Sequence, residues 1–287
     1  MGERKLRGGR RGAVRVKDPD PTHAMYPYIM KRRNESLLYF EMEADATKLL
    51  QIVRQSKKGE PRLTAFTAVM VAAVKTLYER PRMNRYIAGR RLYQKEKVDV
   101  GFLAKRSMND DAEDINIIVQ FEPEDTPMAM VARVNEAIAG VKDGETDNDP
   151  VLATVMKFPR FILRRIFSFV EWLDFYGKYP KIFEDVDPMR TSLFFSNLGS
   201  INVDACYHHL YDWGTCSIFA TVGRIKKMPF CLDDGRVVAR TVVQMRFTVD
   251  ERVADGYYIA KSINRFKKYI ENPAFLFPEI SAEEVKA

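Results

Sequence analysis

Cysteines are few in this sequence and long apolar runs are absent from it, and each shortage argues against a class of protein. The cysteines, Cys206, Cys216 and Cys231, are few and odd in number, so no disulfide framework is expected. No run of about 18 uninterrupted apolar residues is present, which argues against a membrane-spanning helix. No apolar segment follows the basic N-terminal residues, as one would in a secretory signal. We therefore expect a reduced, cytoplasmic protein.

Net positive charge is scarce too once residues 1–17 are set aside. The chain has 287 residues with 46 Lys and Arg against 39 Asp and Glu, a formal net charge of +7. Residues 1–17 alone hold seven basic residues and one acidic residue, a balance of +6, so residues 18–287 carry only +1. A near-neutral body of this kind does not predict a nucleic-acid-binding surface.

Residues 1–17 also contain too few apolar side chains to fold alone. We expect them to form a solvated, flexible basic arm. The alternatives are a segment ordered across a neighbouring subunit and an arm that binds a polyanion. Residues 18–287 are long enough to bury a core and are expected to form a single domain.

Helical and strand patterns interleave along the rest of the chain. Apolar residues recur at helical spacing in residues 64–77 and 257–270, and Pro81 and Pro273 follow these segments. Strand-like patterns occur at residues 37–43, 98–103, 115–119, 192–196, 217–222 and 237–249. This interleaving predicts an α/β or α+β protein.

A long apolar and basic helical region occupies residues 151–179. Its apolar residues form a broad face, which Arg160, Arg164 and Arg165 interrupt. One interpretation is a helix buried against the sheet or against a neighbouring subunit. The others are a hydrophobic lid over an acyl chain and an interfacial membrane helix whose arginines reach towards water.

Four motifs of the last third occur in a fixed order: A-T-V-G-R-I-K at residues 220–226, D-G at 234–235, R-F-T-V-D-E-R-V-A-D-G at 246–256 and Y-I-E-N-P at 269–273. Together they resemble the acyltransferase catalytic domain of 2-oxo-acid dehydrogenase complexes, in the chloramphenicol acetyltransferase-like superfamily. Two upstream segments are similar to further elements of that family, F-F-S-N-L-G at 194–199 and P-R-M-N at 81–84. The resemblance spans residues 64–276 and is poor over 151–187.

This resemblance implies an α/β two-layer sandwich with a mixed β-sheet, on which the helix of residues 257–270 packs. It implies a coenzyme A thioester as substrate, a small-molecule acyl acceptor, no metal and no nucleic acid. It also implies a homotrimer or a higher trimer-based assembly, with each site built between subunits. Because the catalytic-like domain fills nearly the whole chain, we expect a stand-alone form without a lipoyl domain.

The resemblance also assigns roles to individual residues. The family motif is D-H-R-x-x-D-G, whose histidine is the general base, and Glu251 stands at that position here. Ser196 corresponds to the serine whose hydroxyl stabilises the oxyanion. Asp255 is expected to orient the active-site loop through an arginine such as Arg85 or Arg252.

The replacement of histidine by Glu251 weakens the expected base without removing it. A free glutamate has a pKa about 4 units below that of a thiol, whereas a histidine lies about 2 units below it. The deficit is about 3 kcal/mol, or on the order of 100-fold in rate, and burial of a carboxylate reduces it. The remaining interpretations are an enzyme with another base and a catalytically silent trimeric scaffold of the same fold.

The adjacent residues His208 and His209 are the candidates for another base. Only two residues separate the second histidine from the following aspartate, so the pair does not fit the acetyltransferase H-H-x-x-x-D-G motif. Structural histidines at an interface, a catalytic or substrate-contacting role, and metal binding with Cys206 or Cys216 are the three interpretations. The spacing fits no zinc pattern. The third histidine, His23, is expected to have no role.

Overall fold

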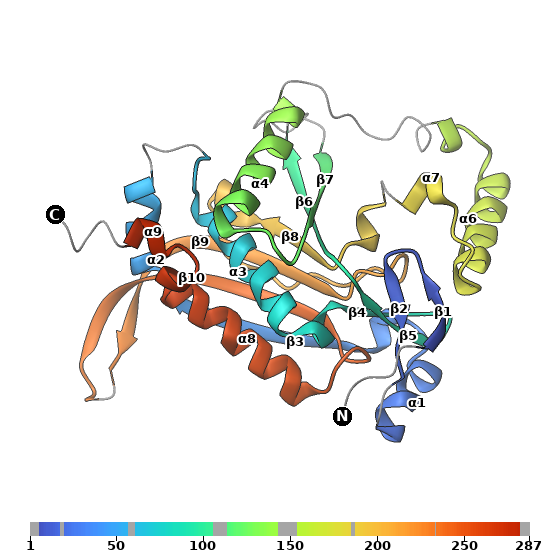
Figure 1. The fold of residues 1–287 in the computed structure, drawn as a ribbon, viewed down its shortest axis with the longest axis horizontal. Coiled ribbons are helices and arrows are strands. Elements are labelled where there is room, and N and C mark those ends of the chain that lie inside the picture. The colour runs from blue at the N-terminus through green and yellow to red at the C-terminus, as the bar shows by residue number, and fades with distance from the viewer. Residues whose placement is uncertain are drawn as a thin grey trace.

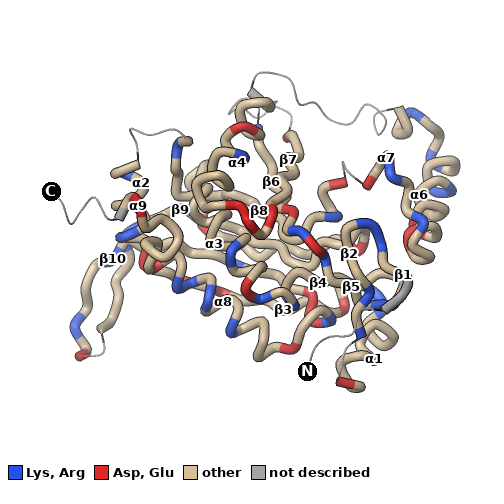
Figure 2. Tube along the Cα trace, viewed as in Figure 1, with Lys and Arg blue, Asp and Glu red and all other residues tan. Residues whose placement is uncertain are grey.

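The computed structural model describes seven stretches of the chain (Figure 1): residues 6–17, 20–56, 61–105, 114–142, 154–184, 187–232 and 234–281. Within these stretches, no helix is both long and apolar enough to cross a membrane. Figure 2 shows basic and acidic residues interspersed along the described chain, which agrees with the near-neutral balance of residues 18–287.

A six-stranded sheet runs through the centre of the molecule, with strand order β3-β10-β9-β8-β6-β7. Strand β8 is parallel to both of its neighbours, and the other pairs are antiparallel. The expected mixed sheet is therefore confirmed. The strands are β3 Leu37–Asp45, β6 Val98–Lys105, β7 Asp114–Phe121, β8 Leu193–Asn197, β9 Ile218–Cys231 and β10 Val237–Asp250.

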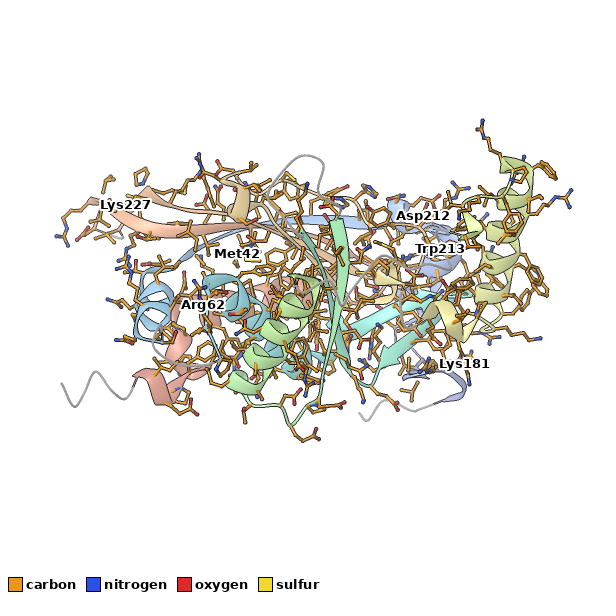
Figure 3. All side chains as sticks on the ribbon, turned by 90° about the horizontal axis from the view of Figure 1, so that it is seen from above. Met42, Arg62, Lys181, Asp212, Trp213 and Lys227 are labelled. Carbon is orange, nitrogen blue, oxygen red and sulfur yellow. The ribbon has the colours of Figure 1, made fainter. Side chains whose placement is uncertain are left out.

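A layer of helices covers one face of this sheet, so the molecule has the expected two-layer arrangement (Figure 3). The helix of residues 257–270 is confirmed as α8 and packs against both β3 and α3. The helices of this layer are α2 Thr47–Gln55, α3 Ala65–Glu79, α4 Pro127–Lys142, α8 Gly256–Glu271 and α9 Pro278–Ser281.

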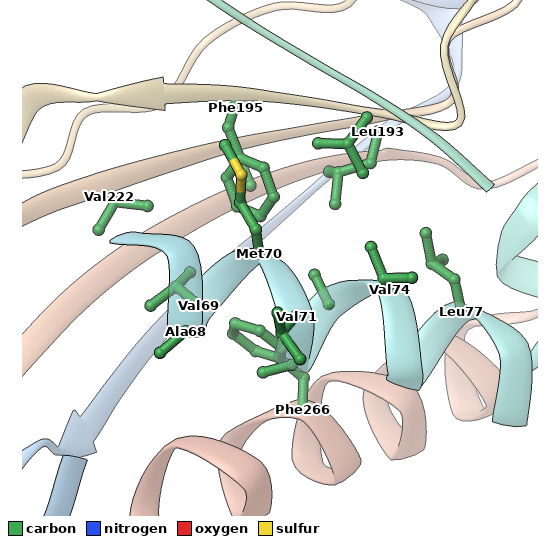
Figure 4. Packing of buried hydrophobic residues seen from close by; sticks show 14 of the residues in the cluster. Ala68, Val69, Met70, Val71, Val74, Leu77, Leu193, Phe195, Val222 and Phe266 are labelled. Atoms are coloured by element: carbon green, nitrogen blue, oxygen red, sulfur yellow. The ribbon is translucent and has the colours of Figure 1, made fainter. Parts of the chain in front are cut away.

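Helix α3 forms the centre of the hydrophobic core (Figure 4). It begins where the Thr64 hydroxyl accepts a hydrogen bond from the backbone N–H of Thr67 at 3.1 Å, and it ends before Pro81. Met70 points towards Phe195 of the sheet, and both side chains are fully buried. The sequence prediction for this helix is confirmed.

A second, smaller sheet has the strand order β1-β2-β5-β4 and includes part of the N-terminus. Residues 6–16 therefore do not form the solvated arm that composition predicted, whereas residues 1–5 lie outside the described stretches. The reason is a partner outside the segment: strand β5 pairs with β2, and Ala13 and Val16 become buried. The strands are β1 Leu6–Arg10, β2 Ala13–Arg15, β4 Arg85–Ala88 and β5 Arg91–Lys95.

Helices α1 Pro21–Ile29, α6 Arg160–Phe175 and α7 Lys181–Glu184 lie outside the main helical layer. Of the side chains of α6, only Val170 is buried, while Phe161 is 71% exposed and Phe169 is 58% exposed. The helix is therefore not buried against the sheet of its own chain. Its aromatic side chains are distributed around the helix, and only one narrow stripe packs. A contact with a neighbouring subunit, with an acyl chain or with a membrane stays a prediction.

The segment of residues 203–216 lies over the face of the sheet opposite the helices. The Thr221 hydroxyl of β9 donates to the carbonyl oxygen of Cys206, and the Thr248 hydroxyl of β10 donates to that of His208, each at 2.5 Å. Tyr39 of β3 contacts the ring of Tyr207 edge-on. These contacts fix the histidine-containing segment on the outer face of the sheet.

Candidate active site

The turn between β10 and α8 carries Glu251, and a buried ionic cluster holds this turn. Asp250 is fully buried. Its carboxylate accepts hydrogen bonds from Nε and Nη2 of Arg252 at 2.8 Å each and from the Ser36 hydroxyl at 2.9 Å. The Arg33 guanidinium lies 3.4 Å away. A carboxylate with these partners fixes the residues on both sides of it.

The charges of this cluster favour ionised Asp250. Burial by itself raises the pKa of the Asp250 carboxyl, but the hydrogen bonds and the charges of Arg252 and Arg33, with the Ser36 hydrogen bond, outweigh burial and hold that pKa below its usual range. Burial lowers the pKa of the Arg33 guanidinium, against the opposing charge of Asp250. The ionised carboxylate and its two arginines thus form one buried unit.

Glu251 is positioned by its backbone. Its N–H donates to the carbonyl oxygen of Ser36 at 2.9 Å, and its own carbonyl oxygen accepts a hydrogen bond from Nε2 of His23 at 3.0 Å. His23, for which the sequence predicted no role, therefore helps to hold this turn. The half-buried Glu251 carboxylate has no hydrogen-bond or ion-pair partner among the described residues. The arginine beside it, Arg252, is engaged by Asp250 instead.

Asp255 lies at the beginning of α8. Its carboxylate accepts a hydrogen bond from the backbone N–H of Tyr258 at 2.8 Å, as a helix N-cap does. Arg82 lies within ion-pair distance of this carboxylate, at 3.9 Å. Arg85 donates from Nε to Gln94, and the expectation that Arg252 pairs with Asp255 is wrong because Asp250 binds it.

Ser196 lies near the end of β8, where its half-buried side chain points to the face opposite the core residue Phe195. The S-N-L-G motif continues into a short 3-10 turn, Leu198–Ile201. A Cβ on Gly199 would lie 2.8 Å from the carbonyl oxygen of Gly223, so only glycine allows this turn to pack on β9. Both glycines belong to motifs that carried the sequence resemblance.

Glu251 and Ser196 are far apart within one chain. Ser196 pairs with Thr221, which pairs with Arg246, and Glu251 follows Arg246 by five positions. With about 3.3 Å per residue along a strand and about 4.8 Å between strands, the two Cα atoms are separated by about 19 Å. One copy of the chain therefore does not bring the two residues into a single reaction site.

His208 and His209 lie closer to Ser196 than Glu251 does. The His208 ring stacks on Phe219 with 3.9 Å between ring centroids. Phe219 is two positions from Thr221, the residue that pairs with Ser196, so the Cα atoms of Phe219 and Ser196 are about 8 Å apart. Burial lowers the pKa of His208, which keeps its ring neutral near pH 7. Among the described residues, no group of three or more His, Cys, Asp or Glu side chains could hold a metal ion.

The cluster around Asp250 was missed by sequence reasoning. Asp250 and Arg252 flank Glu251 in the D-E-R motif, and this short spacing was a visible signal for an ion pair. Arg33 and Ser36 gave no signal, because more than 200 positions separate them from the motif and only the fold brings them to it.

Residues 186–278 match the family described as 2-oxoacid dehydrogenases acyltransferase (catalytic domain). A stretch of 59 residues is 30% identical to the lipoamide acyltransferase component of the branched-chain alpha-keto acid dehydrogenase complex of Bos taurus, and it covers 21% of this chain and 12% of that protein.

Solved structures agree over nearly the whole chain. The cubic core of the pyruvate dehydrogenase multienzyme complex gives a TM-score of 0.61 at 15% identity, covering 96% of this chain and 95% of that one. Dihydrolipoamide acetyltransferase from Azotobacter vinelandii gives 0.58 at 16% identity, with 96% and 95% covered. A probable dihydrolipoamide acetyltransferase from Listeria monocytogenes gives 0.58 at 16% identity, with 89% and 94% covered.

These structural similarities show the fold: the chain has the α/β fold of 2-oxo-acid dehydrogenase acyltransferase catalytic domains. Residues 186–278 carry the sequence pattern of that family, so the resemblance drawn from the motifs is confirmed. In the Azotobacter vinelandii enzyme, roles in the catalytic mechanism have been investigated for a serine, a histidine and, four positions after the histidine, an asparagine.

Proposed function

We propose that the protein transfers an acyl group between coenzyme A, or another thioester, and a small-molecule acceptor. The observation that carries this proposal is the Glu251 turn. A buried ion pair and two backbone hydrogen bonds fix it, yet the carboxylate at the position of the family histidine has no partner among the described residues. Structural charges in the same turn are paired, as Asp250 is, and Glu251 differs from them.

The proposed site is built from two copies of the chain, with Glu251 from one and Ser196 from the other. Support comes from their separation of about 19 Å within one chain, which no side-chain rotation closes. A homotrimer, or a higher trimer-based assembly, would create such a site at each interface. A mass near 33 kDa in solution at micromolar concentration, that of one 33.2 kDa chain, would contradict this assembly.

The proposed reaction moves one proton and one acyl group. The Glu251 carboxylate takes the proton from the attacking thiol, and the thiolate sulfur forms a bond to the thioester carbonyl carbon. The oxygen of the tetrahedral intermediate accepts a hydrogen bond from the Ser196 hydroxyl. The intermediate then breaks its original carbon–sulfur bond, and the departing thiolate takes the proton from Glu251. Asp255 stands four positions after Glu251, where the Azotobacter vinelandii enzyme has its asparagine, and caps the helix that follows the turn.

Substitution of Glu251 tests the assignment. We expect Glu251→Gln to abolish acyl transfer, measured by chromatography as the conversion of acetyl-coenzyme A to free coenzyme A with a small thiol as acceptor, and Glu251→His to retain or increase it. Glu136→Gln, which removes an exposed carboxylate on α4, is the matched control and should leave the rate unchanged. Unchanged turnover in Glu251→Gln would contradict the proposal for this residue.

A second candidate base is His208, because it lies on the same face of the sheet as Ser196. If Glu251→Gln keeps its activity and His208→Gln loses it, this histidine is the base. If both variants and the wild-type protein lack activity while coenzyme A gives no thermal protection, the silent-scaffold interpretation stands. The cytoplasmic location stays a prediction.

A further inference from the structure

A cavity of about 530 Å³ lies beside the Glu251 turn, between the end of α1, the β4–β5 turn, the C-terminal end of α6 and residues 212–214. Figure 3 labels Asp212 and Trp213 at this end of the sheet, next to α6. The volume lies in the range of small-molecule sites, which is about 300–1,000 Å³. Arg252, the neighbour of Glu251, lines the cavity, but Glu251 itself does not.

The walls of this cavity carry excess positive charge. The Asp250 carboxylate pairs with both Arg33 and Arg252 and offsets one of their two positive charges. The carboxylates of Asp174 and Asp187 offset the charges of Arg190 and Arg10. Three further cations line the cavity and have no acidic partner among the described residues, and they outnumber the two remaining acids, Glu171 and Asp212. These cations are Lys31, Arg32 and Arg90. The seven basic and five acidic side chains of the cavity and its immediate support leave a net charge of +2.

The position of Arg90 is strained. It follows Gly89 in the two-residue turn between β4 and β5, and their φ angles are +58° and +55°. This turn type favours glycine, asparagine or aspartate, and an arginine in it is strained. A Cβ on residue 89 would lie 2.2 Å from the carbonyl oxygen of Phe175, so position 89 of the turn requires glycine. Strained residues of this kind gather at ligand clamps.

Ion pairs hold two of the arginines that line this cavity. The buried Nε atoms of Arg33 and Arg190 lie 3.4 and 3.5 Å from carboxylate oxygens of Asp250 and Asp187. Trp213 and Tyr179 add flat apolar wall to these polar groups. The cavity thus combines positive charge and aromatic surface in one place.

We propose that this cavity binds a small dianion, either a phosphate monoester or a dicarboxylate. Two negative charges match the net charge of +2, and guanidinium groups bind both phosphate and carboxylate through paired hydrogen bonds. Arg90, held over the ring of Tyr28 at the rim, contacts the ligand together with Lys31 and Arg32. This binding does not depend on acyl transfer.

Isothermal titration with glycerol 3-phosphate and with succinate tests the proposal on the full chain without any acyl donor. One of the two dianions is expected to bind, more tightly at low salt than at high salt, while glycerol and acetate do not. The dianion that binds identifies the ligand class. Wild-type protein that binds neither dianion would overturn the proposal.

The variants distinguish binding in this cavity from nonspecific attraction of an anion to a basic protein. Arg90→Gly relieves the strained turn, so it should fold at least as well as wild type and yet weaken binding at least about tenfold. Arg32→Gln should weaken it as well. Arg54→Gln removes an exposed cation of α2, remote from the cavity, and should leave binding unchanged. Equal affinity in Arg90→Gly, Arg54→Gln and wild type would contradict the proposal, whereas retained binding in Glu251→Gln separates this site from the proposed reaction.

Discussion

The turn that carries Glu251 and the strand that carries Ser196 are held by different kinds of contact. The turn depends on a buried ionic cluster, in which Asp250 meets arginines from its own motif and from the far N-terminal part of the chain. The strand depends on sheet register and on close approach between two glycines. Ionic contacts therefore fix the Glu251 side of the proposed site, and close backbone packing fixes the Ser196 side. Different substitutions should destabilise each side.

The largest effect is expected from Asp250→Asn. The substitution keeps the size of the side chain but leaves two buried arginines facing a neutral amide, which should reduce the free energy of unfolding by about 3–5 kcal/mol. Urea titration followed by circular dichroism measures this loss. Asp234→Asn, in an exposed hairpin, is the control and should change stability by less than about 0.5 kcal/mol. A loss below about 1 kcal/mol for Asp250→Asn would show that the cluster does not hold the turn.

A smaller loss of stability is expected on the Ser196 side, which close backbone packing fixes. Gly199→Ala places a Cβ 2.8 Å from the carbonyl oxygen of Gly223, and the strain should cost about 1–3 kcal/mol. Gly256→Ala is a matched control, because a Cβ there meets nothing within 4 Å and the residue begins α8. Urea titration should show it as neutral or slightly stabilising. If the two alanine variants were equally stable, close packing of the S-N-L-G turn would not be needed.

The pH dependence of stability should also separate the two sides. The folded pKa of Asp250 lies below its unfolded value, so the unfolded chain binds an extra proton near pH 4. Its contribution is complete above the unfolded pKa of about 3.9 and is lost as the pH falls through the folded value. The stability gap between wild type and Asp250→Asn should narrow below pH 4 by at most about 1.4 kcal/mol per pH unit. The gap between wild type and Gly199→Ala should stay constant over the same range.

The smallest effect on folding is expected from Ser196→Ala. The hydroxyl has no hydrogen-bond partner among the described residues, so stability should change by less than about 0.5 kcal/mol. Acyl transfer should fall by about 10²–10³-fold, because an oxyanion donor is lost. Thermal unfolding and the chromatographic assay of acetyl-coenzyme A conversion give the two numbers. A variant with full activity would remove Ser196 from the proposed site.

Local sequence patterns predicted the parts of this molecule that neighbours along the chain determine. The α3 helix has an apolar pattern, a threonine cap and a following proline, and all three lie in one short segment. Helix α6 is also rich in apolar residues, but its aromatic side chains remain exposed, because periodicity does not reveal whether a second layer covers a face. Residues 6–16 differ for a similar reason, since strand β5, which orders them, lies about 80 positions away.

The candidate site divides in the same way. The positions of Glu251, Ser196 and Asp255 follow from motifs, and the structure adds where each points and what holds it. The roles of Arg33, Ser36 and His23 depend on contacts across the fold, which spacing along the chain does not encode. The arginine opposite Asp255 was also misassigned, because Asp250 competes for Arg252.

Mixing two inactive variants tests most directly whether Glu251 and Ser196 act across an interface. Glu251→Gln is expected to abolish acyl transfer, and Ser196→Ala to reduce it at least about 100-fold. When they are unfolded together in equal amounts and refolded, a random assembly should contain intact sites at about one quarter of the interfaces and recover about that fraction of wild-type activity. Each variant refolded alone is the control. No recovery in the mixture, with wild-type protein active after the same treatment, would contradict a site built from two copies.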